Sequence, residues 1–295
     1  MQMDNIVEQE KRDIKVGSLW NDEFRKNASI LVANGQPVGV FNRGVCAIWV
    51  DASNDKALNR IHDIKGEGRK GRTLAVSLKT EQVIPLIDYD KVGFNKDLTS
   101  GLLKTLSSFS FIRIPILDNE ADNMPPSIIS KSNNGVSYLQ YWDPSGHYPT
   151  SELVECMFDQ GVQYPGLTSM NLSGSKELVT VDEGIEFSKA KGIPLFLVDD
   201  RDPGVIKGSY LILSLNPDGM NVEREGNIPS RIMERILGIE FNRRNTKGSN
   251  YPQHDFPETL TENLSPQNAR AALVFYLQGR SIEKINSFFE KYKLR

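Results

Sequence analysis

The sequence predicts an α/β protein built on a mixed sheet, and two observations carry that prediction. From Ser29 onward, short apolar runs alternate with segments whose apolar residues recur at helical spacing. Turn-forming Gly, Asn and Pro residues punctuate this alternation. The length of 295 residues suits one large domain, or one domain of about 200 residues with smaller pieces attached.

The elements follow from periodicity and turn chemistry. Two neighbouring strands are predicted at 37–41 and 45–50, with residues 42–44 as the turn. Before them, only a short helix around 19–24 is predicted. The later elements are, in order, a helix at 54–65, a strand at 73–78, helices near 81–87 and 95–107, a strand at 110–117, a surface loop at 118–134, a strand at 136–142, a helix at 151–160, a strand ending at 166–169, a helix from Thr180 to Gly192, and strands at 194–198, 209–215 and 222–224.

The composition changes near both ends of the chain. Residues 1–28 are polar and form a predicted N-terminal extension, and residues 29–244 form the α/β domain. Residues 245–264 are rich in Asn, Pro, Thr and Gly, and are predicted to be a linker. Ser265 and Pro266 suit a helix start, so residues 265–295 are predicted to form a helical hairpin.

Composition excludes several classes of function. No apolar run approaches the roughly 18 residues of a membrane span, and two cysteines cannot build a disulfide framework, so a cytoplasmic location is expected. The net charge of −3 argues against nucleic-acid binding as the main role, because such proteins usually carry a basic excess. His62, His147 and His254 have no metal-ligand spacing, and no metal site is predicted.

A basic, glycine-rich loop runs from Gly66 to Thr73. Its spacing is that of a phosphate-binding loop, but a helix precedes it and a strand follows, which is the reverse of the order that such loops require. A cluster of four cations there can still bind phosphate as charges and forks: Lys65, Arg69, Lys70 and Arg72. The other interpretation is a solvated basic turn.

A second constellation, TSMNLSG, begins at Thr168 where a predicted strand ends. Hydroxyl and amide side chains at the carboxyl edge of a sheet can bind a ligand by hydrogen bonds. A turn rich in Ser and Asn is the alternative.

Together these segments resemble the YrdC-like family of threonylcarbamoyl-AMP synthases. The IKG at Ile64 and the TLAVSL at Thr73 are similar to the family's IKGRPKxxPLxVL, TSMNLSG to its TSANxSG, and REGNI at Arg224 to its RxGxI. The first strands and DASNDKALNRIHDIKG, from Asp51, follow the family as well. The resemblance covers roughly 29–238. It implies a YrdC-like three-layer fold with a twisted mixed sheet (α/β, or α+β in some schemes), to which the C-terminal hairpin is added.

Members of that family condense ATP, bicarbonate and threonine into threonylcarbamoyl-AMP, which serves tRNA modification. The resemblance therefore implies a nucleotidyltransferase with ATP, Mg²⁺ and a small-molecule substrate. By position, the implied nucleotide-binding residues are Lys65, Arg72, Ser169, Asn171, Ser209 and Arg224. Lys65 and Arg69 are the implied catalytic cations, and Asn42 and Arg43 are the candidates for substrate contact.

The chain departs from the family where the amino acid binds. The family's PTxTxYG reads FNRGVCA from Phe41, so Asn42, Gly44 and Cys46 replace two Thr and one Tyr. A family Arg falls near Leu139 or Gln140. The nucleotide half of the site is thus retained better than the threonine half.

Three functions follow from this pattern. The first is an ATP-dependent enzyme that forms a carbamoyl-adenylate, with bicarbonate and an amino acid or amine other than threonine. The second is a catalytically inactive module that binds nucleotide, RNA or another partner. The third is a different acyl- or carbamoyl-transfer step.

Overall fold

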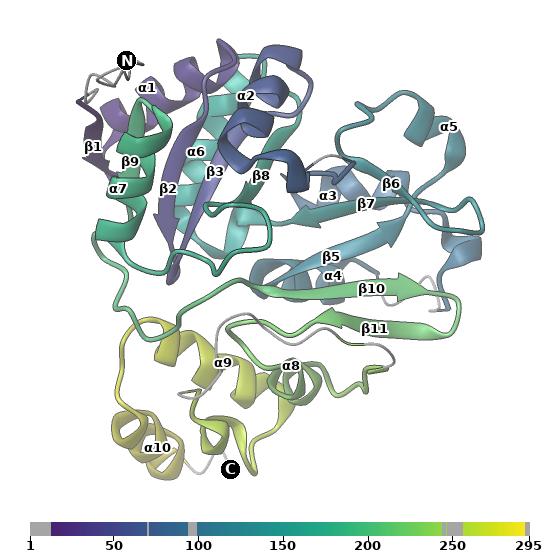
Figure 1. Ribbon diagram of the computed structural model, residues 1–295. Coiled ribbons are helices and arrows are strands. Elements are labelled where there is room, and N and C mark those ends of the chain that lie inside the picture. The colour runs from purple at the N-terminus through teal and green to yellow at the C-terminus, as the bar shows by residue number, and fades with distance from the viewer. Residues whose placement is uncertain (1–12, 70, 94–98, 244–245, 247–255, 293–295) are drawn as a thin grey trace, which may run out of the picture.

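The computed structural model describes residues 13–69, 71–93, 99–243, 246 and 256–292, and one mixed sheet organises them (Figure 1). Its strand order is β1-β9-β2-β3-β8-β4-β7-β5-β10-β11, and β6 pairs with β7 beside this path. The sheet contains parallel pairs such as β9–β2 and β5–β10 and antiparallel pairs such as β2–β3 and β3–β8. The predicted α/β class with a mixed sheet is confirmed.

The strands are β1 (Lys15–Ser18), β2 (Val38–Asn42), β3 (Val45–Asp51), β4 (Ala75–Ser77), β5 (Ser110–Pro115), β6 (Ile129–Lys131), β7 (Ser137–Trp142), β8 (Pro165–Ser169), β9 (Leu195–Val198), β10 (Leu211–Asn216) and β11 (Gly219–Arg224). The helices are α1 (Asp22–Ala33), α2 (Asp55–Lys65), α3 (Thr80–Val83), α4 (Thr99–Phe109), α5 (Asp118–Asp122), α6 (Tyr148–Asp159), α7 (Val181–Lys191), α8 (Ser230–Leu237), α9 (Pro266–Leu277) and α10 (Ile282–Lys291).

Helices cover the two faces of the sheet, which gives three layers. On one face, α1 and α6 pack together over a core that includes residues of β9, β2 and β3. On the other face, buried residues of α2, α4, α8 and α9 share one core with residues of most strands. Because side chains alternate along a strand, β2 sends Val38 and Val40 into the first core and Phe41 into the second.

The start of the chain differs from the prediction. The helix expected around 19–24 begins at Asp22, after a cap in which the Asn21 side chain accepts from two backbone amides, and it continues to Ala33. Ala28 and Val32 extend it, because they are buried in the core that α6 shares. β1 pairs in parallel with β9, and the predicted boundary between residues 28 and 29 falls inside α1.

Two other stretches were misread. The expected surface loop at 118–134 contains α5, whose first turn bonds the Leu117 carbonyl, and β6, which pairs with β7. α8 has no counterpart in the prediction. Its Ile232, Met233 and Ile236 are buried, and it ends at Gly238, which has a positive φ of 68°.

The predicted C-terminal hairpin is present as α9 and α10. It lies against α8 below the β10–β11 pair, and Ala269 and Leu273 of α9 are buried in the core of the sheet (Figure 1). Within the predicted linker, residues 258–261 form a short 3₁₀ helix with Leu260 buried, while 247–255 lie outside the described residues. None of the helices in the described ranges is long and apolar enough to cross a membrane.

Candidate functional site

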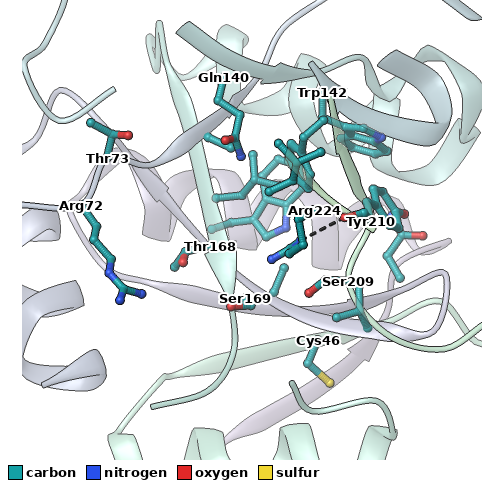
Figure 2. A pocket seen from close by; sticks show the side chains of 18 residues that line it. Cys46, Arg72, Thr73, Gln140, Trp142, Thr168, Ser169, Ser209, Tyr210 and Arg224 are labelled. Carbon is teal, nitrogen blue, oxygen red and sulfur yellow. Dashed lines mark hydrogen bonds between the residues drawn. The ribbon is translucent and has the colours of Figure 1, made fainter. Parts of the chain in front are cut away.

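A cavity of about 230 Å³ opens on the face of the sheet that α1 and α6 cover at its other end. Its lining comes from the end of β2, from β3, β4, β5, β7, β8, β10 and β11, and from the segments that lead into β4 and β10. Trp49, Trp142 and Tyr210 form its apolar wall. Figure 2 shows Arg72 and Arg224 on either side of Thr168 and Ser169.

Strand pairing explains why distant segments meet here. β8 lies between β3 and β4, with Ala47 opposite Ser169 and Ala75 opposite Leu167. The segment that connects the basic loop to β4 places Arg72 and Thr73 at the same cavity. The loop and the TSMNLSG segment, which are 100 residues apart in the sequence, therefore become neighbours.

Lys65 is buried, with 4% of its surface exposed, and it ties these two segments together. Its Nζ donates to the backbone oxygen of Ser169 at 2.6 Å and to Oδ1 of Asn171 at 2.7 Å. Ser169 Oγ donates to the same Asn171 oxygen at 2.7 Å, and the Lys65 carbonyl accepts from the amide of Ser173. We call Lys65, Ser169 and Asn171 the lysine cluster. Only its Ser169 is part of the cavity lining.

The basic loop contributes Arg72 to the cavity, and Arg72 is exposed. Gly68 passes so close to the TSMNLSG segment that a Cβ on it would lie 2.9 Å from Cβ of Ser173. The side chain of Arg69, which was predicted to be catalytic, lies outside the described residues.

Ser209 and Arg224 stand on the opposite wall. Ser209 Oγ donates to Oε1 of Glu177, a carboxylate that is 3% exposed, at 2.9 Å. Arg224 donates from one terminal nitrogen to the Tyr210 carbonyl at 2.9 Å, and its Nε has no hydrogen-bond partner among the described residues. Burial lowers the pKa of Arg224. A partly buried cation whose Nε is unpaired among the described residues suits an anionic ligand.

The two predicted substrate residues diverge. Asn42 lines the cavity, while Arg43 is not part of the lining. The Arg43 guanidinium donates instead to the backbone oxygens of Ser108 and Gly146. Arg43 also has a positive φ of 48°, as expected for a residue in the tight turn between β2 and β3.

From the sequence alone, His147 and Asp199 are candidates only as metal ligands, and neither is connected with Thr150. In the structure the three residues form a group behind Asn42. His147 Nδ1 lies 2.7 Å from Thr150 Oγ1, and His147 Nε2 lies 2.8 Å from Asp199 Oδ2. Asn42 Nδ2 donates to Thr150 Oγ1 at 3.0 Å. We call Asn42, Thr150, His147 and Asp199 the histidine cluster. The signal in the sequence was that Asn42 and Asp199 each come directly after a predicted strand.

Metal and thiol chemistry find little support in the described ranges. No group of three His, Cys, Asp or Glu residues there could hold a metal ion, and the cavity lining contains no carboxylate. Burial raises the pKa of the Cys46 thiol to about 12, so this residue is protonated at neutral pH, as expected for a small apolar residue.

Comparison with known proteins gives a result for the fold alone. No family model matches the chain, and no curated protein matches it. Among solved structures, Sua5 from P. abyssi in complex with L-threonine has a TM-score of 0.58 at 16% identity, over 81% of this chain and 67% of that one. A hypothetical protein from Streptococcus mutans has a TM-score of 0.55 at 12% identity, over 81% of this chain and 100% of that one. YciO from E. coli has a TM-score of 0.52 at 14% identity, over 72% and 96%.

The fold is YrdC-like. The predicted three-layer fold with a twisted mixed sheet is thereby confirmed. In a second Sua5 structure, a variant with TM-score 0.59 and 16% identity, the match spans 65% of that chain, so this chain is similar to about two thirds of Sua5. At these identities, the YrdC-like fold carries no activity with it.

Proposed function

We propose that the cavity binds ATP and a small acceptor, and that the protein forms a carbamoyl-adenylate. The observation that carries this proposal is the convergence of Arg72, Ser169 and Arg224 on one cavity of a YrdC-like fold. The three residues come from three separate segments of the sequence. Two cations there provide what a polyphosphate requires, and the apolar wall of Trp49, Trp142 and Tyr210 suits a purine base.

The chemistry asks little of the protein beyond position and charge. Bicarbonate and an amine condense to a carbamate with loss of water. A carbamate oxygen then attacks the α-phosphorus of ATP, and the bond from this phosphorus to the oxygen that bridges to the β-phosphate breaks to release pyrophosphate. Arg72 and Arg224 would stabilise the negative charge that develops on the transferring and leaving groups. The lysine cluster would keep the Ser169 wall rigid while this occurs.

Mg²⁺ would be bound through the phosphates of ATP and not by a protein cage. The cavity lining contains no carboxylate, and Mg²⁺ commonly keeps several waters and binds substrate phosphates. When bound there, Mg²⁺ neutralises phosphate charge and assists pyrophosphate departure.

The direct test is pyrophosphate release from ATP and bicarbonate in the presence of a panel of amino acids and amines. Release that depends on both bicarbonate and one member of the panel supports the proposal. Tight ATP binding without release under any condition would instead favour the second candidate below.

Threonine is not expected to be the preferred acceptor. Asn42, Gly44 and Cys46 occupy the positions of family residues that surround the amino acid, and each unpaired buried polar group costs about 1–3 kcal/mol. Several lost partners should therefore lower threonine use far more than tenfold relative to a preferred acceptor. Threonine-dependent release at the level of the best panel member would contradict this expectation.

Phosphate binding is tested by Arg72→Ala, with Arg270→Ala on the exposed side of α9 as the matched control. Removal of a charge-assisted contact should weaken ATP binding by about 1–3 kcal/mol. AMP should be affected less, because it lacks the outer phosphates. Calorimetry with ATP and AMP measures both, and an equal loss for the two nucleotides would remove Arg72 from the triphosphate site.

A second candidate is a module that binds a nucleotide without catalysis. It is favoured by the state of Lys65, whose ammonium is already bound to Ser169 and Asn171 and which is not part of the cavity lining. RNA would be a further partner for such a module. Binding of ATP and of short RNA with no pyrophosphate release would support it.

A further inference from the structure

The histidine cluster is a continuous line of hydrogen bonds that ends at the cavity. Asp199 follows β9 and Asn42 ends β2, and the two parallel strands bring them to the same edge of the sheet, where the Asp199 amide bonds the Phe41 carbonyl. His147 and Thr150 stand at the first turn of α6 between them. Thr150 is fully buried, and Asp199 and Asn42 are 5% and 8% exposed.

The protons in this line can be placed in only one way when His147 is neutral. The oxygens of the Asp199 carboxylate can only accept hydrogen bonds. Oδ1 accepts from Trp20 Nε1 and from the Arg201 amide, and Oδ2 must accept from His147 Nε2. His147 therefore carries its proton on Nε2, and its Nδ1 accepts from the Thr150 hydroxyl. Thr150 Oγ1 in turn accepts from Asn42 Nδ2.

The opposite orientation of the Asn42 amide conflicts with this line. A flipped amide would present Oδ1 to Thr150, whose hydroxyl would donate to it and accept from His147 Nδ1–H. Neutral His147 would then turn a lone pair on Nε2 toward the Asp199 carboxylate. Only a protonated His147 avoids that repulsion.

His147 is held neutral by its surroundings. Burial, helped by the Arg43 guanidinium, lowers the pKa of His147, and the hydrogen bond and charge of Asp199, with Asp202 beyond it, oppose that shift without reversing it. Asn42 Oδ1 is the end of the line, and it is buried without a hydrogen-bond partner among the described residues.

We propose that His147 and Thr150 are positioning residues that fix the Asn42 amide with its oxygen unpaired at the border of the cavity, so that the site selects ligands whose N–H donor reaches this oxygen. Ser209 and Ser169 act in the same sense, because each spends its hydroxyl proton on a neighbour and leaves lone pairs. A ligand without a donor would leave the Asn42 oxygen buried and unpaired. The inference rests on the proposed function in that it takes this cavity as the ligand site, and two N–H sources fit it: the amine of the acceptor and the exocyclic amine of adenine.

The first test needs no ligand. In two-bond ¹H–¹⁵N NMR spectra of the full chain at pH 7.5, His147 should be the Nε2–H tautomer. An Nδ1–H tautomer or a charged imidazole at this pH would overturn the proposal.

The second test compares ligands that differ by one amine. ATP is compared with purine riboside triphosphate, in which hydrogen replaces the exocyclic amine, and L-aspartate and L-threonine are compared with succinate and 3-hydroxybutanoate. In the wild-type protein the amine-bearing member of at least one pair should bind about tenfold more tightly or better. The nucleotide pair and the acid pairs identify which amine reaches Asn42.

Thr150→Val and Thr150→Ser test the contribution of the Thr150 hydroxyl to the histidine cluster. Val has nearly the shape of Thr but no hydroxyl, so the preference should fall to within about threefold, while Thr150→Ser retains the hydroxyl and should keep it. Thr150 is not itself part of the cavity lining, so both substitutions act on the cavity only through Asn42. An unchanged preference in Thr150→Val, or no amine preference in the wild type for any pair, would overturn the proposal. Loss of the proposed function alone would appear as an amine preference that persists without pyrophosphate release.

Discussion

The lysine cluster and the histidine cluster border the same cavity, and they differ in where their hydrogen bonds end. In the lysine cluster the ammonium of Lys65 and the hydroxyl of Ser169 both end on the Asn171 oxygen, and the Asn171 amide ends on the Ser175 carbonyl. In the histidine cluster the line ends at Asn42 Oδ1, which has no partner among the described residues. A closed cluster fixes the chain, whereas an open one has a group left for a ligand.

The two clusters also differ in whether their residues match the motifs of the YrdC-like family. The lysine cluster consists of residues that a family resemblance can point to, and its inward-facing bonds hold two loops together. The histidine cluster consists of residues that match no family motif in this chain, and it borders the position where the chain departs from that family. The closed cluster thus accounts for the architecture of the site, and the open one is where its selectivity would differ.

The largest expected effect comes from opening the closed cluster. Lys65→Met keeps the aliphatic chain but leaves the Ser169 carbonyl without its lysine donor and the Asn171 oxygen with one donor fewer, so we expect a loss of about 2–4 kcal/mol in the free energy of unfolding. Urea unfolding measures it. Lys189→Met, which removes an exposed ion pair with Glu186, is the matched control and should cost no more than about 0.5 kcal/mol. Equal stability of the two variants would mean that the lysine cluster does not hold the loops.

Asp199→Asn should have a smaller effect on the free energy of unfolding, but it should reverse the direction of the hydrogen bonds in the histidine cluster. The amide group of Asn can donate to His147 Nε2, which would move the imidazole proton to Nδ1 and turn the Asn42 amide nitrogen toward the cavity. We expect a loss of about 1–2 kcal/mol, because charge-assisted bonds from Trp20 and His147 become neutral ones.

Two measurements check this reversal. Urea unfolding gives the stability, and NMR of the imidazole nitrogens gives the tautomer, which should change from Nε2–H to Nδ1–H. Ligand preference should then move from amine donors toward acceptors. If the Asp199→Asn variant keeps the Nε2–H tautomer, Asp199 does not set the direction of the hydrogen bonds between His147, Thr150 and Asn42.

Much of the fold could be predicted because local signals agree with it. The helix predicted at 54–65 is present as α2, with Asn54 as its N-cap, and Thr180 and Glu183 form the capping box that opens α7. The turn between β2 and β3 follows from Arg43-Gly44, where Gly44 has a positive φ of 73°. Each signal lies within a few residues of the element that it sets.

The rest could not be predicted, because it depends on contacts between distant segments. α1 extends to Ala33 because α6, more than 100 residues later, covers Ala28 and Val32. The histidine cluster joins positions 42, 147, 150 and 199, and no spacing in the sequence relates them. Asp199 by itself reads as the start of a polar loop, and only the parallel pairing of β9 with β2 brings it near Asn42.

The smallest expected effect is the dependence of stability on pH, which reports the open cluster directly. Burial keeps the folded pKa of His147 below its ordinary value near 6.5, so between these two values the unfolded chain binds the proton more strongly than the folded chain. The stability that neutral His147 contributes is therefore present in full above about pH 6.5, and it is lost as the pH falls from there through the folded pKa. Asp199 acts only at more acidic pH. Although burial raises its pKa, the hydrogen bonds from His147 and Trp20 hold that pKa below its ordinary value, and this adds stability that is lost only at still lower pH.

Thermal unfolding between pH 5 and 8 should show a midpoint temperature that falls below about pH 6.5. The His147→Asn variant should lack this fall, and the His62→Asn variant, at an exposed position of α2, should retain it. A midpoint that stays flat in the wild-type protein across this range would mean that His147 is not held neutral, and the orientation of Asn42 would lose its cause.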